Sequence, residues 1–422
     1  MKRFLRSLAV FVLALVSVAA YAQQAAEPPK VEAPKIDEQV KQSVLTDLTM
    51  ILTTTAFVPG VDFEKWPTLI ADFKDQIDKA QTTDDFTGTV NTALSELGFS
   101  HILLFSPRMA EQRVTNKIVG IGVRIQIEDK GIRVVRVFDD GAAAGAGIKI
   151  GDLIIEADGK PVHTPADLAG KAGEPVKITI DRNGVIIQRD LVRKEFSTVI
   201  PEELSWPEKD VALLTIPSFD QSYDEQHVQD LMAEAESAKH LIIDLRGNGG
   251  GRVSNLRHLS SFFLTREQPL GTFVDKSAIK HYEEETGDAD ADVFKVAKWD
   301  TKKLLPLIRN KPPFKGDVAV LIDGGTGSAS EMFAAALKEQ RGATLIGSRS
   351  VGAVLASVMT QISDGFLIQY PLMDYVTIKG VRLEGNPLVP DKDAAPPKYG
   401  EPDEGVTEAV KMFKKEDIGS AA

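Results

Sequence analysis

A strand, a glycine-rich turn and a helix follow one another between residues 317 and 337, and this succession constrains the fold most. The strand is the apolar run Asp317–Asp323, and three glycines within the next four residues end it. The helical pattern then opens at Glu331 and continues with the apolar stretch 332–337. Buried strands that alternate with apolar helices are typical of an α/β protein.

Two interpretations of Ser328, in the turn before this helix, are open. In the first, Ser328 and Glu331 form a capping box, S-x-x-E, which satisfies backbone N–H groups at the helix start. In the second, the Ser328 hydroxyl is an exposed nucleophile at the positive end of the helix dipole, beside N–H groups that lack an intrahelical partner. The segment by itself favours the cap, because cap motifs are common.

The first 22 residues have the pattern of a secretory signal peptide. Basic residues lie within the first six positions, an apolar run covers residues 8–19, and an A-x-A cleavage site ends at Ala22. The apolar run is shorter than the roughly 20 residues that a membrane span needs. We therefore expect cleavage after Ala22 and a periplasmic or secreted protein, with no stable membrane insertion after cleavage.

Charge and cysteine content exclude several classes of protein. The sequence has no cysteine, so neither a disulfide framework nor lipid attachment through cysteine is possible. Loss of the signal peptide removes three positive charges and takes the net charge from −12 to −15. A polyanionic chain argues against nucleic acid as a partner. The sequence also lacks H-E-x-x-H and histidine–carboxylate clusters at ligand spacing, so we expect no metal and no cofactor.

About 400 mature residues imply more than one domain, and the pattern of apolar residues changes several times along the sequence. Apolar residues recur at helical spacing in the N-terminal part, short β segments follow, and strands then alternate with helices. The acidic piece 281–292, within the less regular region 266–315, is typical of a solvated loop. The expected parts are a signal peptide (1–22), a Pro-rich linker (23–36), a helical part (37–115), a β-rich domain (116–194), an α/β core (195–395) and a tail with a short helix (396–422).

The β-rich part contains a specific pattern, GAAAGAGIKIGDLI, at Gly141–Ile154. It resembles the PDZ domain family, whose usual pattern here is G-x-A-x-x-A-G-[IL]-x-x-G-D-x-I. The resemblance implies that a loop of backbone N–H groups binds the C-terminal carboxylate of a polypeptide, which adds to the neighbouring sheet edge. The alternative is that the glycines of this loop only shape a turn. The loop residues are Gly120, Ile121, Gly122 and Val123.

A second glycine-rich turn, DLRGNGGG at Asp244–Gly251, follows another apolar strand and precedes a helix. Consecutive glycines allow backbone N–H groups to face a substrate oxygen at close range, as half of an oxyanion hole does. A phosphate-binding loop is the competing interpretation. The turn lacks the Lys-Ser/Thr of a P-loop and the spacing G-x-G-x-x-G, so we do not expect nucleotide binding.

DLRGNGGG, then GSASE, then LEGNPLVPD stand in the order of the tail-specific or C-terminal processing protease family, which this chain resembles over nearly all residues after the linker. The resemblance implies a multidomain α/β protein, with a helical N-terminal part, an inserted PDZ domain and a serine protease core of crotonase-like architecture. It also implies that Ser328 is the nucleophile. The Ala329 N–H and that of Gly249 or Gly250 would bind the oxyanion.

One departure from this family concerns the base. The common branch uses a Ser-Lys dyad, whose lysine lies in a G-K-G-x-V-Q stretch. Here that stretch is GAVLAS, with Ala353 at the lysine position and Ser357 at the glutamine position. An alanine cannot accept a proton, so this dyad cannot operate. Lys379, on another predicted strand, is an alternative source of the base.

A second branch of the family, similar to the tricorn protease core, uses a Ser-His pair and a distant glutamate. This chain has Ser100-His101, within the apolar strand-like run 99–105, and Glu384 in LEGNPLVPD. The resemblance implies that His101 takes the Ser328 proton and that Ser100 orients the imidazole. Glu384 would assist this network or bind the substrate amine. His101 as an ordinary core residue and Glu384 as a partner of a backbone N–H are the alternatives.

Together these patterns predict a periplasmic or secreted serine endopeptidase that acts on polypeptides, with a PDZ domain that binds substrate C-termini. The alternative function is a non-catalytic PDZ-containing adaptor with a degenerate protease cleft. Ala353 and Ser357 motivate this alternative, because they replace residues on which the common branch depends.

Overall fold

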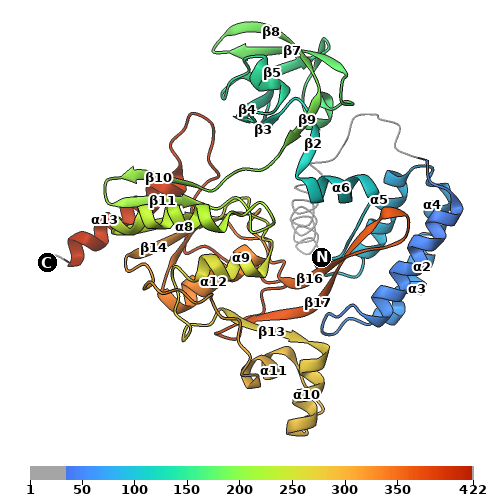
Figure 1. Ribbon diagram of the computed structural model, residues 1–422, viewed down its shortest axis with the longest axis vertical. Coiled ribbons are helices and arrows are strands. Elements are labelled where there is room, and N and C mark those ends of the chain that lie inside the picture. The colour runs from blue at the N-terminus through green and yellow to red at the C-terminus, as the bar shows by residue number, and fades with distance from the viewer. Residues whose placement is uncertain (1–34, 421–422) are drawn as a thin grey trace, which may run out of the picture. The chain divides into compact units, whose positions relative to one another are not determined.

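The computed structural model describes residues 35–420, which form two compact units (Figure 1). The expected signal peptide and nearly all of the linker lie outside the described residues. Most of the expected helical part is in the same unit as the α/β core. The β-rich unit comprises residues 35–36, 81–85 and 106–199, and the larger unit comprises 37–80, 86–105 and 200–420.

The β-rich unit is built around one antiparallel sheet with the strand order β3-β4-β5-β7-β8, in which β6 lies beside β5. Its core consists of inward-facing aliphatic side chains such as Ile132, Ile154 and Ile178, all fully buried. β2 and β9 form a separate antiparallel pair. The elements are α6 (Pro107–Thr115), β2 (Lys117–Gly120), β3 (Val123–Glu128), β4 (Gly131–Val137), α7 (Ala142–Gly145), β5 (Leu153–Ala157), β6 (Lys160–Pro161), η2 (Pro165–Leu168), β7 (Pro175–Arg182), β8 (Val185–Val192) and β9 (Lys194–Ser197).

The larger unit contains a six-stranded sheet with the order β10-β11-β12-β14-β15-β18. All neighbouring pairs are parallel except β10 with β11. β12 and β14 are apolar along nearly their whole length, as expected of parallel strands that are covered on both faces. The strands are β10 (Glu203–Glu208), β11 (Val211–Thr215), β12 (His240–Asp244), β14 (Asp317–Ile322), β15 (Thr344–Gly347) and β18 (Lys392–Asp393).

Helices cover both faces of this sheet (Figure 1). One apolar cluster joins alternate strand residues to α8, α9 and α12, and a second joins the other strand residues to α13 through Ala409, Met412 and Phe413. The expected tail helix is therefore longer than predicted and forms one layer of the core. The helices are α8 (Glu225–Glu234) with η3 (Ala235–Ser237), α9 (Val253–Ser260), α12 (Ala329–Arg341) and α13 (Glu404–Ser420).

A second sheet of the larger unit is built on β17, which pairs with β1, β13 and β16. The predicted strand at 99–105 is shorter in the structure, because only Leu103–Phe105 pairs with β17 and the backbone of His101 has a φ of 60°. The strands are β1 (Leu103–Phe105), β13 (Gly271–Asp275), β16 (Leu355–Gln361) and β17 (Leu367–Thr377), with η4 at Ser363–Gly365.

The remaining helices lie before β1 and after β13. The expectation of a solvated acidic loop at 281–292 is wrong for its first half, because α10 (Lys276–Thr286) is a helix with the Asp275 side chain as its N-cap and Gly287 at its end. Among the described residues, no helix is both long enough and apolar enough to cross a membrane. The other helices are α2 (Glu38–Thr54), η1 (Phe63–Lys65), α3 (Trp66–Ala71), α4 (Lys74–Lys79), α5 (Thr83–Ser95) and α11 (Val293–Trp299).

Candidate active site

Ser328 lies at the N-terminus of α12, directly after the turn that follows β14. Its backbone has φ 54° and ψ −120°, a conformation that costs a non-glycine residue about 1–3 kcal/mol. The Ser328 N–H donates to Glu331 Oε2 (3.1 Å), which is one half of the predicted capping box. The Ser328 Oγ lies 3.0 Å from His101 Nε2. The two interpretations of Ser328 are thus compatible in one geometry.

His101 is the first member of a chain of polar contacts that leads away from Ser328. His101 Nδ1 lies 2.7 Å from Ser100 Oγ, and Ser100 Oγ donates to Glu384 Oε2 at 2.8 Å. Because the Ser100 hydroxyl donates its one proton to Glu384, it is left to accept from Nδ1–H. Nε2 then carries the lone pair and faces the Ser328 hydroxyl, which is the tautomer that a general base requires.

Glu384 is nearly buried and both of its oxygens are engaged. The Ser100 N–H donates to Oε1 and the Val354 N–H donates to Oε2, each at 2.8 Å. Only 6 % of the residue is exposed. The geometry therefore fits the predicted part in the His101 network and the alternative of a backbone partner, and not binding of a substrate amine.

The position of His101 depends on a residue that the sequence analysis did not single out. The Asn91 side chain, on α5, accepts from the Leu104 N–H (2.7 Å) and donates to the Leu104 carbonyl (2.9 Å). These two bonds hold β1 on one edge while β17 pairs with it on the other. An Asn on a helix face has no distinctive sequence signature, so its distant partner could not be read from the pattern.

Two of the three predicted oxyanion donors are available in the structure. Within the described part of the chain, the Gly249 and Ala329 N–H groups donate no hydrogen bond. The Gly250 N–H instead donates to Asn248 Oδ1 (2.9 Å). Gly250 is therefore corrected from a candidate donor to a packing residue, since a Cβ there would lie 2.7 Å from the Ser328 Cβ.

Asn248 holds the glycine loop, residues 244–251, in place. It is fully buried, its Nδ2 donates to the Ile216 carbonyl (2.8 Å), and its own carbonyl accepts from the Gly327 N–H (3.0 Å). Asn248 thus joins the loop both to the backbone just after β11 and to the turn that carries Ser328. The motif DLRGNGGG offers a signal for this role of Asn248, which is the one amide side chain among the glycines. Such a side chain needs hydrogen-bond partners elsewhere in the structure.

Ala353 and Ser357, expected at the lysine and glutamine positions of the Ser-Lys branch, make other contacts in the structure. The Ala353 carbonyl accepts from the Ser328 N–H at 3.0 Å, and Ser357 Oγ accepts from the Gln369 side chain at 2.8 Å. Lys379 lies exposed in the turn after β17, where its N–H donates to Glu339. Among the described contacts, the partner of Ser328 Oγ is His101.

Glu331 is a buried acid in the first turn of α12, three residues after Ser328. It accepts from Ser350 Oγ (2.5 Å), from the Gly352 and Ala353 N–H groups (2.8 and 3.0 Å) and from the Ser328 N–H. Burial raises the pKa of Glu331 to about 7, although these hydrogen bonds oppose the rise. Glu331 therefore joins Ser328 to the segment that replaces the lysine-bearing one.

The raised pKa of Glu331 predicts a pH-dependent stability. Between about pH 4.5 and 7 the folded chain retains a proton that the unfolded chain has lost, so the unfolding free energy falls as pH rises through this window, by about 3 kcal/mol. Glu331→Gln lacks this titration. We expect the unfolding free energy of the wild type minus that of the variant to fall by this amount from pH 4.5 to 7.5. Denaturant unfolding of both proteins at several pH values measures this difference. Parallel pH profiles of the two proteins would contradict the assignment.

The predicted carboxylate-binding loop of the β-rich unit lies between β2 and β3. The Ile121 carbonyl accepts from the Ala143 N–H (2.7 Å), and Gly122 has φ +83°, with its Cα so near Gly141 that a Cβ would lie 2.4 Å from the Gly141 Cα. Val123 begins β3, which is an edge strand of its sheet. The glycines thus allow a close backbone contact, and an edge is present to which a strand could add.

The described residues offer no group of three or more His, Cys, Asp or Glu side chains that could hold a metal ion.

Two parts of the chain match known family models. Residues 210–394 match the model of peptidase family S41, and residues 119–191 match a PDZ domain model. A probable CtpA-like serine protease of Staphylococcus haemolyticus is 26 % identical over 296 residues, which cover 68 % of this chain and 54 % of the relative. A carboxy-terminal-processing protease of Bartonella bacilliformis is 28 % identical over 294 residues, with 66 % and 63 % covered. The chain thus spans little more than half the length of the curated relatives it matches.

A solved structure with the same fold is that of a putative S41 protease from Bacteroides fragilis. It superposes with a TM-score of 0.53 and 15 % sequence identity, over 90 % of this chain and 98 % of that one. At this identity the likeness concerns the fold, which is a mixed α/β architecture with helical, PDZ and α/β core parts.

Proposed function

We propose that this chain, which carries an S41-family peptidase domain and a PDZ domain, is a serine endopeptidase that cleaves polypeptide substrates. The observation that carries the proposal is the chain of contacts from Ser328 Oγ through His101 to Ser100 and Glu384, with steps of 3.0, 2.7 and 2.8 Å. These are the distances at which a base can take the proton of a nucleophile.

The proposed reaction proceeds in two halves. His101 Nε2 takes the Ser328 proton while Oγ attacks the carbonyl carbon of the scissile bond, and the Gly249 and Ala329 N–H groups bind the resulting oxyanion. His101 then gives the proton to the leaving amine as the C–N bond breaks, which leaves an acyl ester on Ser328. Water attacks this ester with His101 as base, and the proton finally returns to Oγ.

In this proposal the chain uses the Ser-His branch of chemistry. Ala353 removes the base of the Ser-Lys dyad, and the exposed Lys379 lies in a turn. We also propose a crotonase-like topology for the core and a periplasmic or secreted location. The motivation for the location is the signal-peptide pattern of the first 22 residues.

The PDZ domain is proposed to bind the C-terminus of the substrate. Its loop 120–123 and the edge strand β3 offer backbone N–H groups for a carboxylate and an edge for an added strand. The free C-terminus of an unfolded or processed polypeptide carries both features, so the domain would select such chains for cleavage.

A non-catalytic adaptor is the second candidate, and the observation that favours it is Ala353 at the lysine position. A fluorophosphonate probe separates the two functions, because it phosphonylates a serine only when the serine is activated. We expect stoichiometric labelling of the wild type, none in Ser328→Ala, and unchanged labelling in the control Ser357→Ala. Absent labelling with intact binding of C-terminal peptides would establish the adaptor instead.

A further inference from the structure

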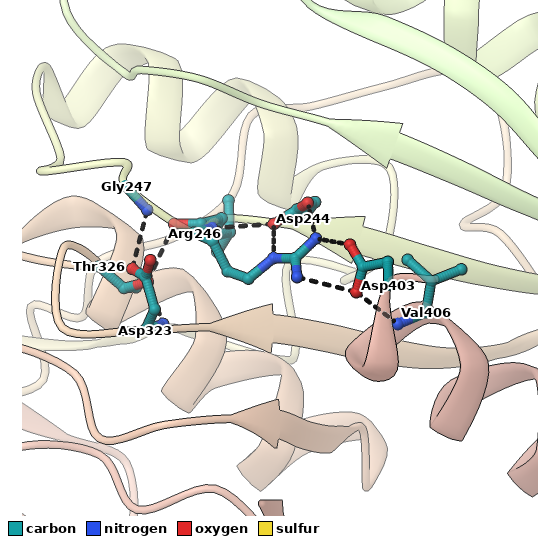
Figure 2. A network of polar contacts seen from close by, with 8 residues as sticks. Asp244, Arg246, Gly247, Asp323, Thr326, Asp403 and Val406 are labelled. Atoms are coloured by element: carbon teal, nitrogen blue, oxygen red, sulfur yellow. Dashed lines mark hydrogen bonds and ion pairs between the residues drawn. The ribbon is translucent and has the colours of Figure 1, made fainter. Parts of the chain in front are cut away.

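The C-terminal helix begins at a carboxylate that reaches the glycine loop of the active site. Asp403 directly precedes α13, and its Oδ1 accepts from the Val406 N–H (3.1 Å), which caps the helix. The same carboxylate accepts from Arg246 Nη1 (3.0 Å) and Nη2 (2.7 Å) (Figure 2). One side chain therefore caps α13 and also holds an arginine of the motif DLRGNGGG.

Arg246 is held by two carboxylates at once. Its Nε and Nη2 donate to Asp244 at 2.9 and 2.6 Å, so that Nη2 is shared by Asp244 and Asp403. Only 12 % of the arginine side chain is exposed. Burial lowers the pKa of Arg246, but the two carboxylates outweigh it and raise this pKa above its ordinary value. Because charged forks of this kind are directional, the pair of aspartates fixes the plane of the guanidinium.

The backbone that follows Arg246 leads straight to the proposed oxyanion donor. The Gly247 N–H donates to Asp323 Oδ1 (2.8 Å), at the end of β14, as Figure 2 shows. The Asn248 contacts come next, and the exposed residue Gly249 follows. The start of the loop is therefore held between Asp323 on one side and the Arg246–Asp403 fork on the other.

We propose that Asp403 is a positioning residue for the oxyanion hole, acting through Arg246 on the backbone of residues 247–249. The inference rests on the proposed function, in which the Gly249 N–H binds the oxyanion. Donors of an oxyanion hole must lie about 2.7–3.1 Å from the developing charge, so a small displacement of the loop weakens the transition state more than the bound substrate. The C-terminal helix is then a part of the active site, although it touches no substrate.

The chain offers a matched control for this proposal. Glu408, one turn further along α13, forms ion pairs with Lys392 (2.8 Å) and Lys411 (3.5 Å), and no described hydrogen bond or ion pair joins Glu408 to the glycine loop. Asp403→Asn and Glu408→Gln each remove one negative charge from the same helix, together with the ion pairs of that charge. Asparagine is as good a helix cap as aspartate, so Asp403→Asn keeps the start of α13 while it loses the charged fork.

The test compares peptide cleavage and backbone hydrogen exchange in the two variants. We expect Asp403→Asn to lower kcat at least tenfold with KM within twofold, and to speed amide exchange in residues 245–250 at least tenfold. Glu408→Gln should keep both close to wild type. Asp403→Glu, which restores the charge, should recover part of the lost kcat, whereas a role confined to helix stability would change the melting temperature without this split.

Two results would overturn the proposal. One is a folded Asp403→Asn with wild-type kcat and wild-type exchange of the loop, and the other is an equal loss in Glu408→Gln. If Asp403→Asn does not fold, Arg246→Lys provides the same comparison, since lysine keeps the charge but cannot form two forks. If the wild type neither cleaves peptides nor reacts with a fluorophosphonate, the proposed function fails, and the exchange comparison still tests the link between Asp403 and the loop.

Discussion

Replacing His101 by alanine is expected to lower kcat/KM for a cleavable peptide by about a thousandfold or more. The reason is that His101 Nε2 lies 3.0 Å from Ser328 Oγ and, in the proposed mechanism, takes the proton of that hydroxyl. Ser328→Ala should cost at least as much. Because the two residues act as a unit, the double variant should be no slower than Ser328→Ala alone.

The measurement is steady-state cleavage of a tagged peptide, with circular dichroism as the check on folding. His163→Ala is the control, since His163 is exposed and lies in the β-rich unit. Full activity of either His101→Ala or Ser328→Ala would remove the proposed mechanism. An active His101→Ala that becomes inactive on further substitution of Lys379 would assign the base to the lysine instead.

Substituting Gly250 by alanine is expected to damage both the stability of the core and the proposed active site. A Cβ at this position would lie 2.7 Å from the Ser328 Cβ and 2.8 Å from the Gly327 carbonyl oxygen, and the φ of Gly250 is +97°. The neighbours are backbone atoms and the Ser328 side chain, so relief of the clash requires movement of the proposed active site. We expect the unfolding free energy to fall by roughly 3 kcal/mol, from positive φ and overpacking together.

The same substitution should lower kcat/KM by about a hundredfold, because a displacement of Ser328 near 1 Å is enough for a loss of that size. Gly324→Ala is the matched control, since Gly324 lies exposed in the turn before Ser328 and a Cβ there would meet no atom within 4 Å. Denaturant unfolding and peptide cleavage on both variants check the prediction. A Gly250→Ala protein as stable and active as Gly324→Ala would show that the loop moves freely.

Several elements could be predicted from the sequence because their causes are local. The strand at Asp317–Ile322 and the helix at Ala329–Arg341 follow from an apolar run, a glycine break and a capping pattern within about twenty residues. The helix α10 also has local start and stop signals, because Asp275 caps its N-terminus and Gly287 its C-terminus. The acidic composition of residues 281–292 nevertheless led to the expectation of a loop.

The hydrogen bonds of the candidate active site could not be predicted from local sequence patterns. Which glycine N–H stays free depends on the Asn248 side chain, which takes the Gly250 N–H and leaves that of Gly249. The burial of Glu331 and its raised pKa depend on the segment 350–353, which packs over it from elsewhere in the chain. A sequence pattern can indicate which N–H groups and side chains belong to a site. The hydrogen bonds that these groups make within the protein depend on tertiary packing.

The sequence by itself determined that Ser328 would stand at the start of a helix with unpaired N–H groups beside it, since caps and turns are set by sterics over a few residues. Only the tertiary structure brought His101 to within 3.0 Å of Ser328, across 227 positions of the chain, and joined the C-terminal Asp403 to Arg246. Such contacts arise from the pairing of β1 with β17 and the packing of α13 on the central sheet. These long-range arrangements depend on which buried surfaces fit together, and no local pattern records that fit.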